Sequence, residues 1–323
     1  MPPDAGFSGH TPAPAHRLPM DGILILHKPV GPTSHDMVSR VRRLLHTRRV
    51  GHAGTLDPPA EGVLVLFIGR ATRLIEYTAD ADKEYVAECC FGAATDTLDA
   101  SGTVTATADA SGLTREALEE VLPRFRGVIQ QIPPMYSAVH HEGQRLYELA
   151  RRGKEVERRP RDVVIHQLEL LSFEPGTTAR ARLRVVCSKG TYIRALCADL
   201  GEALGIPAHM CALTRTRVGP FRIEDAVSLE ELAEAASGPQ GLAGLFQTGL
   251  LRPPDAAVAH LPCEQVKGDA LVRVRHGNAI PVRTPAEEDR PVRIENNEGE
   301  LVGIGHYERV ADEWRLQPDK IME

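Results

Sequence analysis

The order of strand-like and helix-like segments constrains this chain more than any other feature. Short apolar, β-branched runs typical of buried strands alternate irregularly with segments whose apolar residues recur at helical spacing. The clearest strand-like runs are 22–26, 63–68, 85–91, 163–173 and 181–187. No strand–helix–strand unit repeats along the chain, as it would in a parallel α/β protein. The pattern predicts an α+β fold with a mixed, mainly antiparallel sheet.

Helix starts are marked by hydroxyl side chains placed ahead of helical periodicity. The expected caps are Thr33, with Asp36 completing a capping box, Thr114, Thr191, and Ser228, with Glu231 completing a second box. These signals predict helices that follow each cap, including one after Thr191 whose apolar stripe contains Leu196 and Leu200.

Composition divides the chain into three parts. Residues 1–20 contain five prolines and no apolar core, so we expect a disordered leader and no signal peptide. Residues 21–250 form the expected main domain. A Gly-, Ala- and Pro-rich segment over 236–256 spans the boundary with the next part and is the expected linker. Residues 251–323 form an expected small β-rich domain, with strands near 271–275, 291–294 and 300–304.

The longest apolar run, 63–68, is far shorter than the ~20 residues of a membrane-spanning helix. We therefore expect no membrane association and a cytoplasmic location. The six cysteines form no C-x-x-C pair and mostly lie in apolar runs, so we expect reduced, buried thiols that form neither disulfides nor zinc sites. Because the chain contains no phosphate-binding or dinucleotide glycine motif and no metal-ligand spacing, we expect no cofactor and no metal.

The segment 51–62 (GHAGTLDPPAEG) carries the most informative chemistry. Asp57 precedes two prolines, which disfavour helical backbone at Asp57 and stiffen the chain after it. The pattern predicts a carboxylate on a rigid loop between an arginine-rich helix and a buried strand. Such a carboxylate can act as a nucleophile in sugar chemistry, whereas an Asp-Pro turn without chemistry is the alternative.

The run GHAGTLDPPAEGVL resembles the catalytic motif of the TruB family of tRNA pseudouridine synthases. Four more segments resemble the same family in the same order: GILILHKPVG (22–31), DKEY (82–85), IPPMYSA (132–138) and CSKGTYIR (187–194). Together they span about residues 21–232, and the C-terminal part resembles a PUA-type RNA-binding domain. The resemblance implies the pseudouridine synthase fold and overrides the alternative of a plain Asp-Pro turn.

The resemblance also assigns roles residue by residue. It implies Asp57 as the catalytic aspartate, Tyr85 as the residue stacking on the target base, Arg194 as the partner of the aspartate, Tyr192 and Leu213 as walls of the uracil pocket, His52 as a contact to the RNA loop, Lys28 as a neighbour of the site, and residues 135–161 as a mobile thumb that closes on the T arm. Three positions, His27, Pro59 and Glu61, depart from the family pattern.

These residue types suit the implied reaction, which breaks the N1–C1′ bond of uridine and joins C5 to C1′. The base must first leave its stack, and stacking on Tyr85 can return ~1–3 kcal/mol. Arg194 does not lose its proton, so we expect it to hold Asp57 charged and oriented. Attack at C1′, addition at C6 and elimination to a glycal all remain open for Asp57.

The net charge of −6 is unevenly distributed. Residues 40–49 contribute five arginines without an acid, residues 141–161 have a net charge of +3, and residues 180–194 contain five further basic side chains. Such patches can steer a polyanion although the total is negative, so we expect RNA affinity to fall steeply with salt.

The expected function is therefore that of a tRNA pseudouridine synthase which modifies the T-loop uridine at position 55. Its partner would be the T arm of tRNA; no protein partner is implied, and a monomer is expected. The alternative is a non-catalytic tRNA-binding or tRNA-folding protein on the same scaffold. A glycoside hydrolase would require a second carboxylate, for which Glu61 is the candidate.

Overall fold

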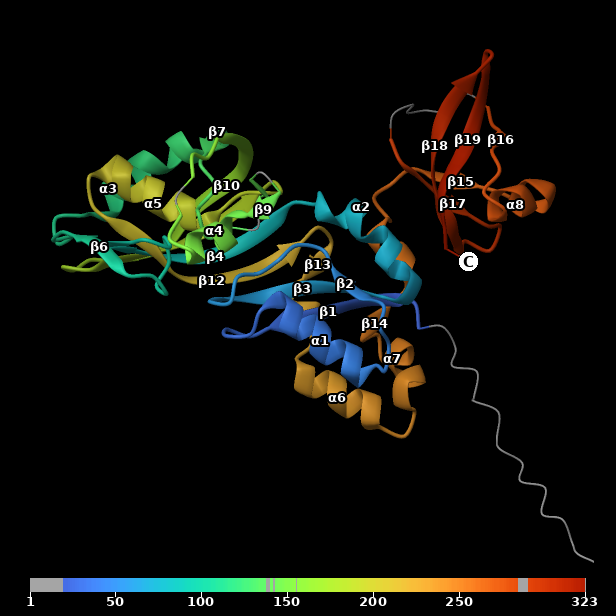
Figure 1. Cartoon of the computed structure of the whole chain (residues 1–323), viewed down its shortest axis with the longest axis horizontal. Coiled ribbons are helices and arrows are strands. Elements are labelled where there is room, and N and C mark those ends of the chain that lie inside the picture. The colour runs from blue at the N-terminus through green and yellow to red at the C-terminus, as the bar shows by residue number, and fades with distance from the viewer. Residues whose placement is uncertain (1–19, 138–139, 142, 155, 284–289, 323) are drawn as a thin grey trace, which may run out of the picture.

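A computed structural model describes residues 20–137, 140–141, 143–154, 156–283 and 290–322 of this chain. The predicted leader lies, apart from Met20, outside the described residues. Figure 1 shows a long, twisted sheet with helices at both of its ends, and a separate small sheet near the C-terminus. Within the described residues, no helix combines the length and the apolar character needed to cross a lipid bilayer.

The long sheet has ten strands in the order β14-β1-β3-β12-β4-β11-β10-β7, with β2 beside β3 and β13 beside β12. The strands are β1 (Gly22–Lys28), β2 (Val50–His52), β3 (Ala60–Ile68), β4 (Lys83–Phe91), β7 (Gly127–Gln131), β10 (Arg161–Glu174), β11 (Ala179–Cys187), β12 (Ala208–Val218), β13 (Phe221–Arg222) and β14 (Leu251–Arg252). The pairing of β3 with β12 is parallel and the other ladders of this sheet are antiparallel. This confirms the predicted α+β fold with a mainly antiparallel sheet.

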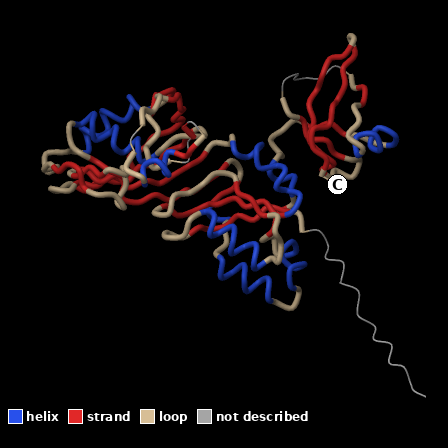
Figure 2. Tube along the Cα trace, in the orientation of Figure 1, coloured by secondary structure: helices blue, strands red, loops and turns tan. Residues whose placement is uncertain are grey.

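Helices cover the sheet in two groups, which Figure 2 shows at its two ends. The helices are α1 (Ser34–Leu44), α2 (Ile75–Ala79), α3 (Arg115–Val121), α4 (Leu146–Arg151), α5 (Ile193–Leu204), α6 (Leu229–Ser237), α7 (Gly244–Gln247) and α8 (Gly268–Arg275). Helices α1, α6 and α7 pack on β1 and β3, whereas α3 and α5 pack on β4, β11 and β12. The shorter 3₁₀ turns are η1 (Gly69–Leu74), η2 (Leu122–Phe125), η3 (Ile223–Asp225), η4 (Gly241–Ala243) and η5 (Pro254–Ala257).

The capping predictions hold at three of four sites. Thr33 with Asp36, and Ser228 with Glu231, both form complete capping boxes, and the Thr114 hydroxyl accepts from the N–H of Ala117. Thr191 was wrongly predicted as a cap. Helix α5 begins after Tyr192 without a side-chain cap. The Thr191 hydroxyl instead donates to the Ser188 carbonyl, within the turn that precedes the helix.

The C-terminal sheet has five strands in the order β15-β17-β18-β19-β16. They are β15 (Cys263–Gln265), β16 (Ile280–Pro281), β17 (Val292–Glu295), β18 (Leu301–Val310) and β19 (Glu313–Ile321). The prediction of a strand over 271–275 was wrong, since these residues belong to α8. Alternation of valine and arginine suited a strand, but Leu271 and Val274, three residues apart, face the core together while Val272 is exposed.

The predicted linker is more ordered than its composition indicated. It contains the end of α6, all of α7 and strand β14, which pairs with β1. Residues 251–258, assigned from the sequence to the C-terminal part, pack on the long sheet, where Ala257 and Val258 enter its core. Two small ribbons complete the fold: β5 (Ala93–Thr95) with β6 (Val104–Thr107), and β8 (His140–His141) with β9 (Gln144–Arg145).

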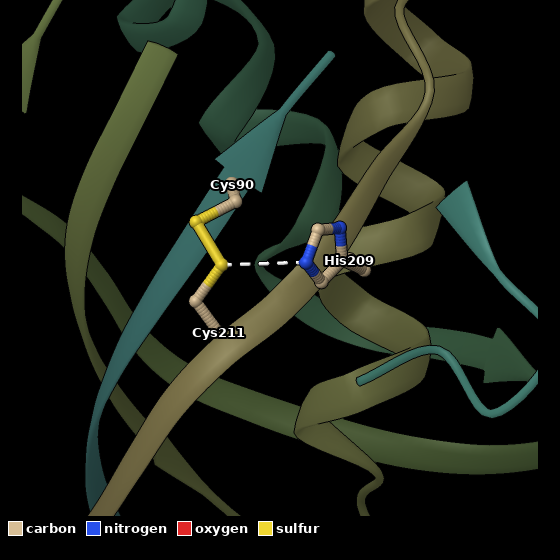
Figure 3. A group of neighbouring side chains, drawn as sticks. All are labelled: Cys90, His209 and Cys211. Carbon is tan, nitrogen blue, oxygen red and sulfur yellow. Dashed lines mark hydrogen bonds between the residues drawn. A yellow bond between two sulfur atoms is a disulfide. The ribbon is translucent and has the colours of Figure 1, made fainter. Parts of the chain in front are cut away.

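The prediction of reduced thiols was wrong for one pair. Cys90 on β4 and Cys211 on β12 form a disulfide beside His209 (Figure 3). The sequence shows no sign of this pair because its members lie 121 residues apart and meet only through the pairing of β4 with β12. Cys89, Cys187 and Cys197 are free and buried, as predicted, and Cys263 is free but exposed.

Candidate active site

The loop that carries Asp57 is held by side chains of two neighbouring elements. The buried Ser34 hydroxyl, at the start of α1, exchanges two 2.9 Å hydrogen bonds with the main chain of Leu56. The buried Lys28 ammonium, at the end of β1, donates to the carbonyls of Pro58 and Ala60 at 3.4 and 2.6 Å. Because both anchors come from the rigid core, the carboxylate next to them is presented from a fixed backbone.

Arg194 lies in the first turn of α5 and points at this loop. Its Nη2 atom is 2.8 Å from Oδ2 of Asp57, and only 5% of its side chain is exposed, against 40% for Asp57. The same guanidinium donates to the carbonyls of Thr97 and Tyr136. A buried cation with fixed partners thus orients a carboxylate that solvent, or a substrate, can still reach.

A pocket of about 280 Å³ opens beside this ion pair. Five of the seven residues predicted for the site line it: Asp57, Tyr85, Tyr192, Arg194 and Leu213. They come from the loop before β3, from β4, from the start of α5 and from β12. The pocket is therefore built by segments that are distant in the sequence and that the sheet brings together.

The other two predicted residues, Lys28 and His52, are not among the residues lining the pocket. Lys28 supports the loop from behind, and burial lowers the pKa of its ammonium to about 8, although the Asp57 carboxylate opposes this shift. His52 is half-buried on β2, where burial and the nearby Arg215 lower the pKa of its imidazole. Both residues are close to the loop without contacting the pocket.

Three charged residues near the pocket were missed by the sequence reasoning. Arg215 on β12 is 1% exposed, lines the pocket and donates to the carbonyls of Gly54, Thr55 and Val63. Lys83 on β4 also lines the pocket, and its ammonium donates to the Ala79 carbonyl. Asp99 is buried with its Oδ2 atom 3.7 Å from Nη1 of Arg194. The available signal was position, because Lys83 and Arg215 each lie two residues from a predicted site residue on the same strand, Tyr85 and Leu213, and alternate residues of a strand share a face.

Tyr85 is the aromatic wall of the pocket. It is packed against the core cluster on its inner side, and burial raises the pKa of its hydroxyl, while the neighbouring Arg215 guanidinium opposes the rise. A neutral phenol ring at the pocket wall offers a stacking surface for a planar base. Among the described residues that line the pocket, Asp57 is the one carboxylate; Glu61 instead accepts a hydrogen bond from Thr214.

The predicted thumb, residues 135–161, meets the site through its first residues. The Tyr136 carbonyl accepts from Arg194, and Ser137 lines the pocket. Beyond these, the predicted thumb contains β8, β9 and α4, and its residues 138–139, 142 and 155 lie outside the described residues.

Two of the three basic stretches, 40–49 and 180–194, differ in their surroundings. On β11 and the turn after it, Arg180, Arg184 and Lys189 are paired with Glu88, Glu84 and Asp80 of neighbouring segments. In and after α1, all five arginines are at least partly exposed: Arg40, Arg43, Arg48 and Arg49 are exposed, and Arg42 is half-buried. The α1 stretch is therefore the stronger candidate for a phosphate-facing surface, because ion pairs already neutralise much of the other one.

Comparisons with known proteins identify the family of this chain. The model of the TruB family pseudouridylate synthase N-terminal domain matches residues 42–193, and that of the tRNA pseudouridylate synthase B C-terminal domain matches residues 194–259. The chain is 53% identical to tRNA pseudouridine synthase B of Symbiobacterium thermophilum, over 82% of this chain and 84% of the relative. It is 43% identical to tRNA pseudouridine synthase B of Pseudomonas aeruginosa, over 95% and 97%.

Among solved structures, the chain is similar to one in an H/ACA ribonucleoprotein bound to a substrate RNA containing 2′-deoxyuridine. The TM-score is 0.70 at 27% identity, over 94% of this chain and 85% of the other. The two family models together cover both the Asp57 loop and the first turn of α5. The chain belongs to the TruB family of pseudouridylate synthases.

Proposed function

We propose that this protein is a tRNA pseudouridine synthase that isomerises the T-loop uridine at position 55, with Asp57 as the catalytic carboxylate. One observation carries the proposal: a reachable carboxylate is fixed by a buried guanidinium at the mouth of a pocket with an aromatic wall. The family membership and the names of the relatives, tRNA pseudouridine synthase B, support tRNA as the substrate.

The pocket residues divide the work of the reaction among them. The target uridine leaves its stack and enters the pocket, where Tyr85 stacks on the base and Tyr192 and Leu213 bound it. Asp57 then acts on the nucleoside while Arg194 keeps its carboxylate in place. The N1–C1′ bond breaks, the uracil turns, C5 bonds to C1′, and the C5 proton is lost while N1 gains one, so atoms and electrons balance without an outside reactant.

The RNA would be held by surfaces outside the pocket. The thumb, residues 135–161, would close on the T arm, and the α1 arginines, which are at least partly exposed, would offer positive charge to RNA phosphates. His52, on β2, follows these arginines and precedes the Asp57 loop in the sequence, and it would contact the distorted RNA loop. Residues from Cys263 onward form a PUA-like module, which we assign to recognition of RNA shape. The protein would act as a monomer without a protein partner or cofactor.

The test is a modification map of unmodified tRNA incubated with the protein and with matched carboxylate variants. Asp57→Asn keeps the size of the side chain and removes its charge, so we expect pseudouridine at position 55 to fall by about 10⁴-fold or more. Glu61→Gln, on the adjacent strand but outside the pocket lining, should keep the activity of the parent protein. Binding of tRNA should persist in both variants.

The outcomes separate the two candidate functions. A protein that only binds or folds tRNA would leave the uridine unmodified, and Asp57→Asn would change nothing measurable. Modification that survives Asp57→Asn would exclude Asp57 as the catalytic group, and modification at a different nucleotide would reject the assigned position.

A further inference from the structure

A second cluster of reactive side chains lies on the long sheet, outside the pocket. Cys90 on β4 is opposite His209 on β12 in the antiparallel ladder. The ladder is irregular between Met210 and Ala212, so Cys211 is an additional residue on its strand. Figure 3 shows the result: the side chains of Cys90, His209 and Cys211 meet at one point.

The hydrogen bonds of His209 determine which of its nitrogens carries a proton. Nδ1 is 2.8 Å from the Ala93 carbonyl oxygen, and because a carbonyl can only accept, Nδ1 must donate. In the neutral ring Nε2 then has a free lone pair, and it lies 3.4 Å from Sγ of Cys211. His209 is thus positioned to take the proton from the Cys211 thiol, which generates the nucleophilic thiolate.

The two cysteines differ in access to solvent. Cys90 is 2% exposed, whereas Cys211 is partly exposed on its irregular strand segment. A reagent from solution therefore reaches Cys211 first, and Cys90 can react only with a partner already attached to Cys211. This is the arrangement of an attacking and a resolving thiol.

We propose that Cys90, His209 and Cys211 form a reversible thiol–disulfide exchange site that reacts with low-molecular-weight disulfides. The Cys211 thiolate, its proton held by Nε2 of His209, attacks one sulfur of the disulfide and releases one thiol, which takes the proton. The Cys90 sulfur then attacks Sγ of Cys211, loses its proton and expels the second thiol. Two protein thiols are oxidised and one small disulfide is reduced to two thiols.

The same three ligand atoms, all within 4.8 Å of one another, could also suit a thiophilic cation such as Zn²⁺. Structural zinc sites in proteins nearly always use four protein ligands, and among the described residues this group has three. The cysteines are moreover bonded to each other in the structure. These observations favour the disulfide, and zinc binding becomes an outcome of the test.

Closing the disulfide has a structural consequence near the pocket. It joins β4, which carries Tyr85, to β12, which carries Leu213, across 121 residues of sequence. The main chain of Met210, next to Cys211, also bonds to Leu98 and Ala100, which flank the Asp99 partner of Arg194. A cross-link over so long a loop restricts the unfolded chain strongly, so the oxidised protein should unfold at a higher temperature.

The experiment uses the full-length Cys263→Ser protein, in which the one exposed free cysteine is removed. Reduced protein is treated with glutathione disulfide in the presence of a chelator, and thiols are counted by alkylation and mass spectrometry. We expect loss of two thiols, a Cys90–Cys211 cross-linked peptide, and a Tm several degrees higher that reverts with dithiothreitol. Cys211→Ser should abolish all three changes, and His209→Gln should slow closure by about tenfold or more.

A second measurement leaves Cys90, His209 and Cys211 unchanged, so its result does not depend on whether variants of this cluster fold. In the reduced Cys263→Ser protein, brief alkylation should label Cys211 well before Cys90. Equal labelling, closure at an unchanged rate in His209→Gln, or failure of glutathione disulfide to close the pair would overturn the proposal. It would also be overturned if the reduced protein bound one Zn²⁺ per chain through these cysteines and thereby resisted oxidation.

Discussion

The pocket and the C-terminal sheet differ in the charged side chains that they bury. Around the pocket, five charged side chains are buried: Lys28, Lys83, Asp99, Arg194 and Arg215. Among the described residues from 263 to 322, Asn296 is the one buried polar side chain, and the core there is aliphatic. Burying charges costs free energy even when they are paired. The difference teaches that this fold concentrates an energetically costly arrangement at the place where the chemistry is proposed.

The strongest test of this comparison is to replace one buried cationic side chain with another of the same charge. Arg194→Lys loses the planar fork that contacts Asp57 together with the Thr97 and Tyr136 carbonyls. We expect kcat to fall by about 10²-fold or more, and the pH–rate profile to change. Steady-state kinetics on tRNA measures both. Arg293→Lys, in the C-terminal sheet, is the control and should retain parental turnover; full turnover with an unchanged profile in Arg194→Lys would refute the role of Arg194.

The stability of the two regions should respond unequally to loss of a buried polar group. Arg194→Met leaves the buried Asp99 carboxylate without its cation, so we expect a loss of about 3–5 kcal/mol in the free energy of unfolding. Asn296→Ala removes hydrogen bonds within a single turn, for an expected loss of about 1–2 kcal/mol. Denaturant titrations compare the two. Equal losses in the free energy of unfolding would show that the buried charges near the pocket carry no larger electrostatic penalty than a buried polar group in the C-terminal sheet.

Alkaline pH should reveal the burial of Lys28. Its pKa is lowered from 10.5 to about 8 in the folded protein, so between these values the unfolded chain binds a proton that the folded chain does not. Stability therefore rises with pH in this window, by at most about 1.4 kcal/mol per unit from this group. Lys28→Met should flatten the rise, measured by urea unfolding at pH 8, 9 and 10. The exposed Lys267→Met is the control, and parallel slopes for Lys28→Met and the parent would contradict the prediction.

The smallest expected effect concerns RNA affinity. Arg43 lies on α1 with part of its side chain open to solvent, so Arg43→Gln should weaken tRNA binding a few-fold and reduce the slope of log K against log salt by about 1. Arg309, in the C-terminal sheet, is paired with Asp312, and Arg309→Gln should leave the slope unchanged. Filter binding at several salt concentrations distinguishes them. A slope that falls with Arg309→Gln instead would move the phosphate contact to the C-terminal module.

Local patterns were sufficient to predict most elements, but they failed where neighbours compete. Capping boxes at Thr33 and Ser228 were correct because each involves residues three apart in sequence. The turn before α5 claimed the Thr191 hydroxyl, and the aliphatic core of the C-terminal sheet turned the alternating 271–275 segment into a helix. The first outcome was decided by a competing hydrogen bond three residues away, and the second by packing against the rest of the C-terminal core.

The candidate site likewise contains residues that the sequence predicted and residues that only the tertiary structure brought into the site. Motif resemblance named Asp57, Tyr85, Tyr192, Arg194 and Leu213, and the structure places all five around one pocket. It did not name Asp99 or Arg215, whose importance lies in partners far away in the sequence. The Cys90–Cys211 pair was likewise invisible, since it depends on which residue of β12 is the additional one opposite β4.

Residue order alone therefore established that this chain has strands and helices of an α+β protein, with a proline-stiffened carboxylate loop, because such features arise from neighbours along the backbone. The pairing of β4, β11 and β12 decided the rest. It determined whether the carboxylate meets a buried guanidinium, which cations are buried beneath the carboxylate, and which cysteines are in contact. Strand pairing joins residues far apart in sequence through main-chain hydrogen bonds that carry no trace of side-chain identity, so its register emerges only when the whole core packs.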